Sequence, residues 1–263
     1  MEGSRFDELA RALARPHSRR AVVKTLAGGA LGALVAWRGA DASTAAAFNP
    51  ASVVFSDDFE RGTLQKWTQA NGVSIEQTDV AHGRYAARAT STGGAAFAQV
   101  TLSKTYPALF ARVRFKVAQR GGGVTLVQFF TSGGASLVSV YLTDQGNLGF
   151  RDDIAGQDAR STTNVSSGRW HELQVRVKVG QTGTHVEVWL DGGDVTGLNQ
   201  APRLGTTPIR RFQIGESATG DTFDVAFDDV VLATQYIPSN FATSATAGGA
   251  SSQTGGAPIP STT

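Results

Sequence analysis

Hydrophobic and polar residues alternate with a period of two along most of the stretch 52–236. The segment 111–117, Ala-Arg-Val-Arg-Phe-Lys-Val, places hydrophobic side chains on one face and basic side chains on the other. The segment 173–179, Leu-Gln-Val-Arg-Val-Lys-Val, repeats this pattern. Because neighbouring side chains of a strand point to opposite faces, both segments are predicted to be strands with one buried and one solvated face.

Two further segments, 124–130 and 136–142, are largely apolar on both faces. This pattern predicts central strands with one side on the core and the other side lining a groove. Further strands are predicted at residues 52–56, 73–78, 84–90, 96–102, 147–151, 184–190, 209–215 and 223–233. About a dozen strands, with no helix longer than a turn or two, bury their hydrophobic faces most simply in two stacked antiparallel sheets.

The N-terminal residues 1–47 have the layout of an export signal. Arg19 and Arg20 precede a charge-free, Ala- and Gly-rich stretch, and residues 45–47 are three alanines that suit cleavage before Phe48. The apolar stretch is shorter than the ~20 residues of a membrane span, so we expect no stable span after cleavage. An uncleaved N-terminal anchor is the alternative.

The spacing Ser-Arg-Arg-x-x-x-Lys in residues 18–24 resembles the twin-arginine (Tat) consensus, with Val-Val in place of the usual Phe-Leu. The resemblance implies that the Tat translocase exports the chain already folded. The protein is then expected to be secreted or held in the cell envelope.

Composition separates the remaining chain into a domain and a tail. Residues 238–263 carry no charge and consist mostly of Ser, Thr, Gly, Ala and Pro, which predicts a disordered tail after a single domain at 48–237. Cys is absent, which excludes disulfides and thiolate metal sites. The pI of about 9.1 arises largely from the signal, because residues 48–263 hold 17 basic and 18 acidic residues. A nucleic-acid partner is therefore not expected.

Two segments carry a resemblance to a known family. Residues 168–175, Gly-Arg-Trp-His-Glu-Leu-Gln-Val, and residues 186–192, Val-Glu-Val-Trp-Leu-Asp-Gly, flank a short turn at 180–183. This pair resembles the paired strands of laminin G-like domains, within the concanavalin A-like lectin/glucanase group. The resemblance extends loosely over residues 52–234. It implies an all-β, two-sheet antiparallel jelly-roll sandwich, and the group includes lectins, hydrolases, lyases and adhesion modules.

Acidic residues cluster at both ends of the domain and are separated by a turn at 79–85. The set resembles jelly-roll carbohydrate-binding modules, in which a structural calcium joins the first and last strands to such a turn. The resemblance implies Glu60 and Asp228 as ligands, with Asp58 as a possible third and with carbonyl groups of the turn completing the shell. The alternative is that these acids are solvated turn residues or pair with nearby arginines.

A glycan site needs aromatic faces for sugar rings, and amide or charged groups for hydroxyls. Trp189 faces away from the aliphatic side of its predicted strand, so it is predicted either to line a groove or to pack beneath a loop. Tyr141 and Gln128, on the predicted central strands, and Arg151 on the next strand are candidates to join it. The alternative for all four is packing in the core or just outside it.

Catalytic motifs of related folds are missing. The sequence lacks the Glu-x-Asp-x-x-Glu string of laminarinases, and Gln128 lacks the histidine of the Gln-x-His string of alginate lyases. No G-x-S-x-G elbow or phosphate loop is present. His171 and His185 lie on the predicted hairpin, where they could face each other as hairpin partners.

The leading hypothesis is therefore a secreted, non-catalytic domain that binds a polysaccharide or cell-surface glycan. One alternative is a polysaccharide-cleaving hydrolase or lyase of the same fold. A second alternative is a structural or adhesive envelope protein.

Overall fold

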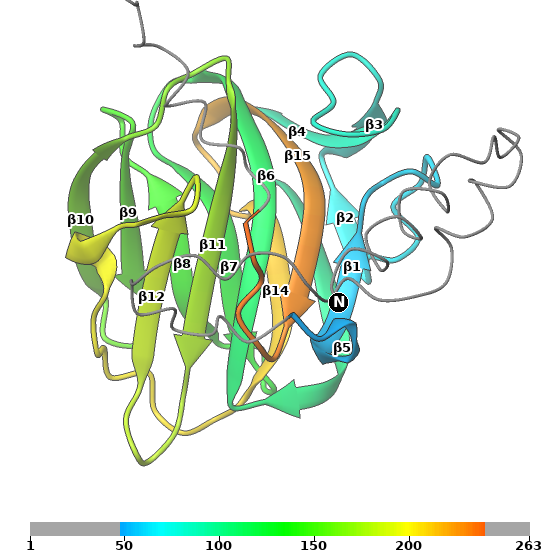
Figure 1. Cartoon of the computed structure of the whole chain (residues 1–263). Helices are drawn as coiled ribbons and strands as arrows, with labels where there is room; N and C mark the ends of the chain where they lie inside the picture. The colour runs from blue at the N-terminus through cyan, green and yellow to red at the C-terminus, as the bar shows by residue number, and fades with distance from the viewer. Residues whose placement is uncertain (1–47, 240–263) are drawn as a thin grey trace, which may run out of the picture. The chain divides into compact units, whose positions relative to one another are not determined.

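The computed structural model describes residues 48–239, which form two stacked antiparallel sheets and two single-turn 3-10 helices, at Pro50–Ser52 and Thr196–Leu198 (Figure 1). The eight-stranded sheet contains β1 (Val53–Asp57), β3 (Val73–Glu76), β4 (Ala86–Thr92), β6 (Ala108–Arg120), β11 (Trp170–Lys178), β12 (His185–Leu190), β13 (Gly193–Asp194) and β15 (Thr222–Ala233). The seven-stranded sheet contains β2 (Gln69–Asn71), β5 (Ala96–Tyr106), β7 (Val124–Thr131), β8 (Ser136–Leu142), β9 (Asn147–Asp152), β10 (Gln157–Asn164) and β14 (Ile209–Glu216).

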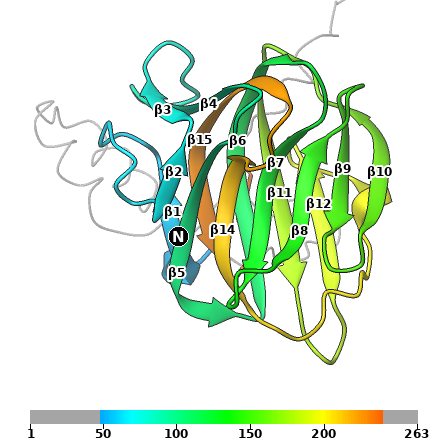
Figure 2. The ribbon, with the colours of Figure 1, turned by 180° about the vertical axis from the view of Figure 1, so that it is seen from behind.

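The strand order explains why chain neighbours are not always sheet neighbours. The seven-stranded sheet runs β10-β9-β8-β7-β14-β5-β2 and is seen from its outer side in Figure 2. The eight-stranded sheet runs β13-β12-β11-β6-β15-β4-β3, and β1 adds to β15. The prediction of an all-β, two-sheet antiparallel sandwich is confirmed. The two segments expected to be central, β7 and β8, do lie inside their sheet.

All twelve strands predicted from alternation are present, and three short or polar strands were missed. β10 has no buried residue, and of its side chains only Ala159 is a hydrophobic one that packs against the core. β2 and β13 are edge strands of three and two exposed residues. Hydrophobic alternation cannot predict these strands, because backbone pairing to a neighbour holds them in place.

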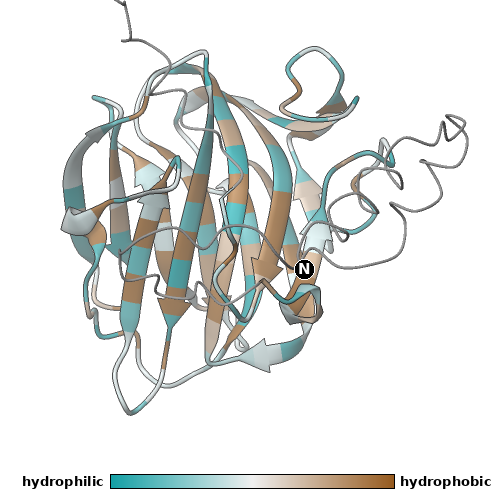
Figure 3. Ribbon diagram, viewed as in Figure 1, coloured by the Kyte–Doolittle hydropathy of each residue, from teal (hydrophilic) through white to brown (hydrophobic). Residues whose placement is uncertain are grey.

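Side chains from both inner faces fill the space between the sheets. Phe129 of β7 meets Phe212 of β14 edge to face, with ring centroids 5.3 Å apart, and both rings are fully buried. Figure 3 shows the corresponding alternation of hydrophobic and hydrophilic positions along the long strands. Because successive side chains of a strand point to opposite faces, the residues before and after each buried one point out of the sandwich.

The first and last strands of the domain lie side by side. β1 pairs with β15 from Val53 opposite Ala233 to Asp57 opposite Val230. The Asp57 carboxylate accepts a hydrogen bond from Nε1 of the buried Trp67 at 2.9 Å, which fastens the loop after β1.

Several predictions concern residues outside the described range. These are the export signal at 1–47 with Arg19 and Arg20, and the tail from residue 240 onward. At the beginning of the predicted tail, the carbonyl oxygen of Pro238 accepts a hydrogen bond of 2.7 Å from Arg112 Nη1. Across residues 48–239 there is no helix of the length and apolarity that crossing a membrane requires.

Candidate functional site

A row of polar side chains crosses the outer face of the seven-stranded sheet, one from each strand. In order across the sheet they are Gln69, Gln99, Gln213, Gln128, Ser139, Arg151 and Asp158. Each is the direct register partner of the next, so the side chains are lateral neighbours on one face. Six inter-strand spacings of about 4.8 Å give the row a length of roughly 29 Å.

Three glutamines of this row form a chain of hydrogen bonds with one direction. Gln99 Nε2 donates to Gln213 Oε1 at 3.2 Å, and Gln213 Nε2 donates to Gln128 Oε1 at 3.4 Å. Gln128 Nε2 in turn donates to Ser136 Oγ at 2.7 Å and to Asp153 Oδ2 at 3.3 Å. An ionised carboxylate only accepts hydrogen bonds, so Asp153 determines which way all three amides point.

Asp153 follows β9 directly and is a meeting point for the row. Its Oδ2 accepts hydrogen bonds from the hydroxyls of Ser139, at 2.5 Å, and of Ser136. Its Oδ1 lies 3.7 Å from Arg151 Nε. The carboxyl side chain is only 14% exposed, so these partners replace most of its water.

At the β8–β10 end the row opens into a hollow of about 280 Å³ that contains Tyr141. The Tyr141 hydroxyl donates to Asp158 Oδ1 at 3.2 Å, and burial raises the pKa of Tyr141 despite the opposing effect of Arg160. The ring lies across Gly149 of the next strand: a Cβ there would stand 2.9 Å from Tyr141 Cζ. Glycine at 149 is what allows the ring to lie flat on the sheet.

The walls of this hollow carry both signs of charge. Arg151 and Arg160 lie on one side, and Glu216 and Asp221 come from the β14 end and the loop that follows it. Glu216 is held by backbone amides, because its carboxylate accepts from Thr125 N at 3.2 Å and from Ala218 N at 2.7 Å. The arginines therefore remain the charged donors that face an incoming ligand.

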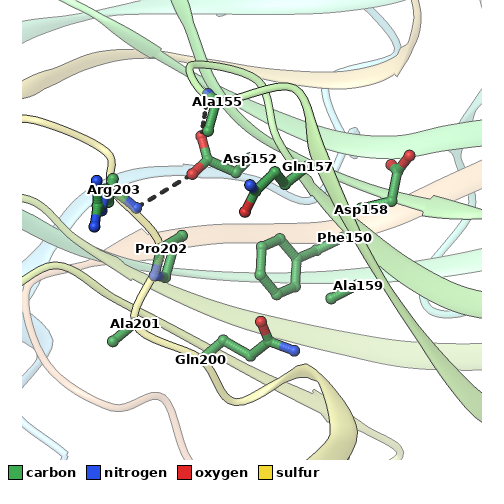
Figure 4. A pocket seen from close by; sticks show the side chains of 10 residues that line it. All are labelled: Phe150, Asp152, Ala155, Gln157, Asp158, Ala159, Gln200, Ala201, Pro202 and Arg203. Carbon is green, nitrogen blue, oxygen red and sulfur yellow. Dashed lines mark hydrogen bonds between the residues drawn. The ribbon is translucent and has the colours of Figure 1, made fainter.

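A second hollow, of about 520 Å³, lies between the edge of the same sheet and residues 200–203 (Figure 4). Its wall includes Phe150 and Pro202, and Asp158 lines both hollows. Asp152 ties the two sides together, accepting from Ala155 N at 2.9 Å and from Arg203 N at 3.2 Å, as the dashed lines in Figure 4 show. Since backbone amides occupy its oxygens, Asp152 shapes this hollow rather than offering a free carboxylate.

The four residues predicted to bind glycan do not share one groove. Gln128, Tyr141 and Arg151 lie together on the outer face of the seven-stranded sheet. Trp189 lies on the outer face of the other sheet, where it stacks on Phe110 at a centroid distance of 6.4 Å and meets Tyr236 at 5.6 Å. The periodicity of β12 gave its outward direction correctly, but it could not tell which sheet the strand joins.

The acids predicted to bind calcium hold the 79–85 turn through backbone amides. Glu60 Oε1 accepts from Arg84 N at 2.8 Å and from Tyr85 N at 2.9 Å. Asp228 Oδ2 accepts from Ala81 N at 3.0 Å and from His82 N at 3.1 Å. Thus Asp228 holds the middle of the predicted turn and Glu60 holds its end.

N–H donors aimed at these oxygens do not fit a cation shell, which needs oxygen ligands. Asp58 is exposed, and within residues 48–239 its carboxylate accepts a hydrogen bond from the nearby Glu60 N, at 3.4 Å. Within residues 48–239, no group of three His, Cys, Asp or Glu side chains is placed to hold a metal. The calcium site remains a prediction of the resemblance alone, and melting with and without chelator tests it.

Sequence reasoning missed Gln99, Gln213 and Asp153. A partial signal existed, because both glutamines occupy polar positions between apolar ones in predicted strands. Their alignment with Gln128 requires β14 to pair with both β5 and β7, and β14 is far from both of those strands in the chain. No local sequence pattern predicts this pairing between distant strands.

Comparison with known proteins supports the architecture. No family model matches the chain, and no curated protein matches it. Among solved structures, the cellulose induced protein Cip1 aligns with a TM-score of 0.58 and 19% identity, over 70% of this chain and 98% of that one. A sialidase aligns with a TM-score of 0.54 and 12% identity, over 69% of this chain but only 18% of that one. At these identities the likeness shows a shared sandwich fold.

Proposed function

We propose that the outer face of the seven-stranded sheet binds a carbohydrate chain that runs across the strands along the polar row. The row itself carries the proposal: seven polar side chains in register align amide, hydroxyl and charged groups over about 29 Å, and the buried Gln213 and Ser139 act by orienting their neighbours. Neutral amides both donate and accept, which suits hydroxyl groups. The two structural neighbours, a cellulose induced protein and a sialidase, support a role connected with carbohydrate.

The site combines these polar groups with one aromatic ring. Tyr141 lies at the β8–β10 end, where a sugar ring can pack against it while Arg151 and Arg160 donate to ligand oxygens. The glutamine chain orders the donors before a ligand arrives, which lowers the entropy cost of binding. The proposed activity is recognition, and we further propose that the exported protein performs it outside the cytoplasm or in the envelope.

Cleavage of a bound polysaccharide is the second candidate, and one observation favours it. The Tyr141 hydroxyl lies between Asp158 and Arg160 in the hollow, and such a phenol can exchange a proton with a substrate. Incubation with mixed glucans and polyuronates separates the candidates. Release of reducing ends or of unsaturated products that absorb in the ultraviolet would establish cleavage.

Binding is tested by affinity electrophoresis of the purified protein in gels containing cellulose derivatives, other β-glucans, mannans or polyuronates. We expect at least one gel to retard the protein. Gln128→Ala and Gln213→Ala each remove an amide from the row and should weaken that binding by roughly 5- to 30-fold, the equivalent of about 1–2 kcal/mol.

The matched control is Thr92→Ala, which changes an exposed residue of β4 in the other sheet and should bind normally. Normal binding by both glutamine variants would overturn the assignment to this face. Failure of every polysaccharide to retard the unaltered protein would overturn the proposed function.

A further inference from the structure

Three side chains outside the proposed carbohydrate site, those of Ser166, His171 and Asp191, are joined by hydrogen bonds. His171 Nδ1 lies 2.7 Å from Asp191 Oδ2, and His171 Nε2 lies 2.9 Å from Ser166 Oγ. Ser166 precedes β11, His171 belongs to it, and Asp191 follows β12. His171 and His185 do not face each other, because the hairpin pairs His185 with Lys178 at its opposite end.

His171 is held rigidly at this position. Its side chain is 8% exposed, and its ring centroid is 5.8 Å from that of Phe115, the residue opposite it on β6. Ser166, in contrast, is exposed on the loop before β11. The arrangement therefore joins a buried imidazole to a hydroxyl that solutes can reach.

Asp191 is oriented by its backbone. Its Oδ1 accepts from Glu172 N at 2.8 Å, and its own N–H donates to Glu172 O at 2.8 Å. Its φ of 52° lies in the left-handed region, which is costly for a residue other than glycine. With its carboxylate fixed against Nδ1, Asp191 keeps a proton on that nitrogen and leaves the lone pair of Nε2 facing Ser166.

We propose that Ser166, His171 and Asp191 form a serine nucleophile site that cleaves esters of small acyl groups. Nucleophile, base and orienting acid have the distances that such a triad requires, without a G-x-S-x-G elbow. This activity is independent of the polar row, with which it shares no residue.

The chemistry balances with water as the only co-substrate. Ser166 Oγ bonds to the ester carbonyl carbon while its proton passes to His171 Nε2. The C–O bond to the alcohol then breaks, and the alcohol leaves with that proton. Water, deprotonated by Nε2, cleaves the acyl-serine to a carboxylic acid and restores the hydroxyl.

The developing negative charge on the carbonyl oxygen needs N–H donors. The amide of Gly168 donates to Val117 O at 2.8 Å. The amide of Ser167, next to the nucleophile in the chain, is the oxyanion donor in this proposal.

One contact defines a competing arrangement. His171 Nε2 also lies 3.1 Å from the Ser166 carbonyl oxygen. A protonated His171 would donate to that oxygen and to Asp191, and it would leave the hydroxyl of Ser166 unactivated. The two arrangements predict different reactivity for Ser166, so the test measures that reactivity.

The test treats the purified protein with a fluorophosphonate probe and maps the modified peptide by mass spectrometry. We expect modification of Ser166 and at least tenfold less of the adjacent Ser167, which is also exposed. Ser166→Ala should abolish labelling, whereas Ser74→Ala, which changes an exposed serine of β3, should keep it. p-Nitrophenyl acetate hydrolysis should fall with Ser166→Ala in parallel.

Asp191→Asn tests the role of the orienting acid. It should slow labelling of Ser166 at least tenfold while circular dichroism confirms the sandwich. If it unfolds, the Ser166 and Ser74 variants and the contrast between labelling of Ser166 and of Ser167 decide the question. Equal labelling of the two serines, or none at Ser166, would overturn the proposal. Because polysaccharide binding is measured separately, failure here leaves the carbohydrate proposal standing.

Discussion

At the residue scale, the carboxylate of Asp153 sets the orientation of the amides in the polar row. Gln128 Nε2 donates to it, and the direction of that bond passes through Gln213 to Gln99. Removing the negative charge without changing the shape of the side chain is therefore a direct test of how the amides are oriented.

Asp153→Asn should disorder the amide chain, because an amide NH₂ can face the Nε2 group of Gln128 where only an acceptor fits. We expect shifted side-chain amide signals of the three glutamines in a ¹⁵N-correlated NMR spectrum, whether or not a ligand is known. Carbohydrate binding should weaken by roughly tenfold, about 1.4 kcal/mol. Asp144→Asn, at an exposed turn, is the control and should leave these signals in place.

Burial of Asp228 makes the stability of the fold depend on pH. It is fully buried, and this burial raises the pKa of its carboxyl from 3.8 to about 6, with the neighbouring Asp229 acting in the same direction. The folded protein then binds a proton between about pH 4 and 6 that the unfolded chain does not bind. This group alone thus makes the fold more stable as the pH falls from 7 to 4.

Asp228→Asn should remove that dependence. Altered hydrogen bonds to Ala81 and His82 shift the stability of the variant by an amount that does not depend on pH, whereas the titration of Asp228 makes the difference from the unaltered protein change with pH by on the order of 2 kcal/mol. Urea unfolding at several pH values measures it, with Asp58→Asn as the exposed control. A difference that is constant between pH 4 and 7 would contradict the raised pKa.

At the scale of the elements, the sequence predicts the individual strands from their local pattern, but it does not predict which distant strands pair. Alternation in residues 111–117 and 173–179 predicted β6 and β11 and their buried faces, because every second residue of a strand with one buried face is hydrophobic. The polar row could not be predicted, since it needs β14 to pair with β5 and β7. Trp189 shows the same limit: its outward direction was predictable, whereas the face it shares with Phe110 and Tyr236 was not.

Either a calcium ion or backbone amide donors can hold β1 and β15 to the 79–85 turn, and the two predict different melting behaviour. A structural calcium would make chelator lower the melting temperature, and Asp228→Ala would remove that effect. The amide donors around Glu60 and Asp228 instead stabilise the carboxylates without a cation. We therefore expect the same melting curve with and without chelator, and a lower melting temperature with chelator would establish the calcium site.

At the scale of the whole molecule, the two outer faces differ in their chemistry. On the eight-stranded sheet the basic side chains of β6 have acidic partners: Arg114 Nε lies 3.5 Å from Asp229, and Lys116 pairs with Asp79. Arg114 is only 7% exposed although it points away from the core. Such paired charges give specific geometry but little net attraction for a ligand. The row on the opposite face instead carries neutral amides and the arginines at its β8–β10 end, which favours that face as the recognition surface.

The fold also bears on how the chain is expected to leave the cell. A sandwich without Cys needs no oxidising compartment to fold, and its core between Ser52 and Tyr236 is built from the chain's own strands. Folding before export is therefore compatible with the resemblance of residues 18–24 to a twin-arginine signal. Replacing Arg19 and Arg20 together by lysine should trap folded protein in the cytoplasm, where cell fractionation and resistance to protease detect it. The matched replacement of Arg11 and Arg15 keeps the pair intact and should leave export unchanged, and continued export of the first variant would contradict the Tat assignment while leaving the fold and both proposed sites unaffected.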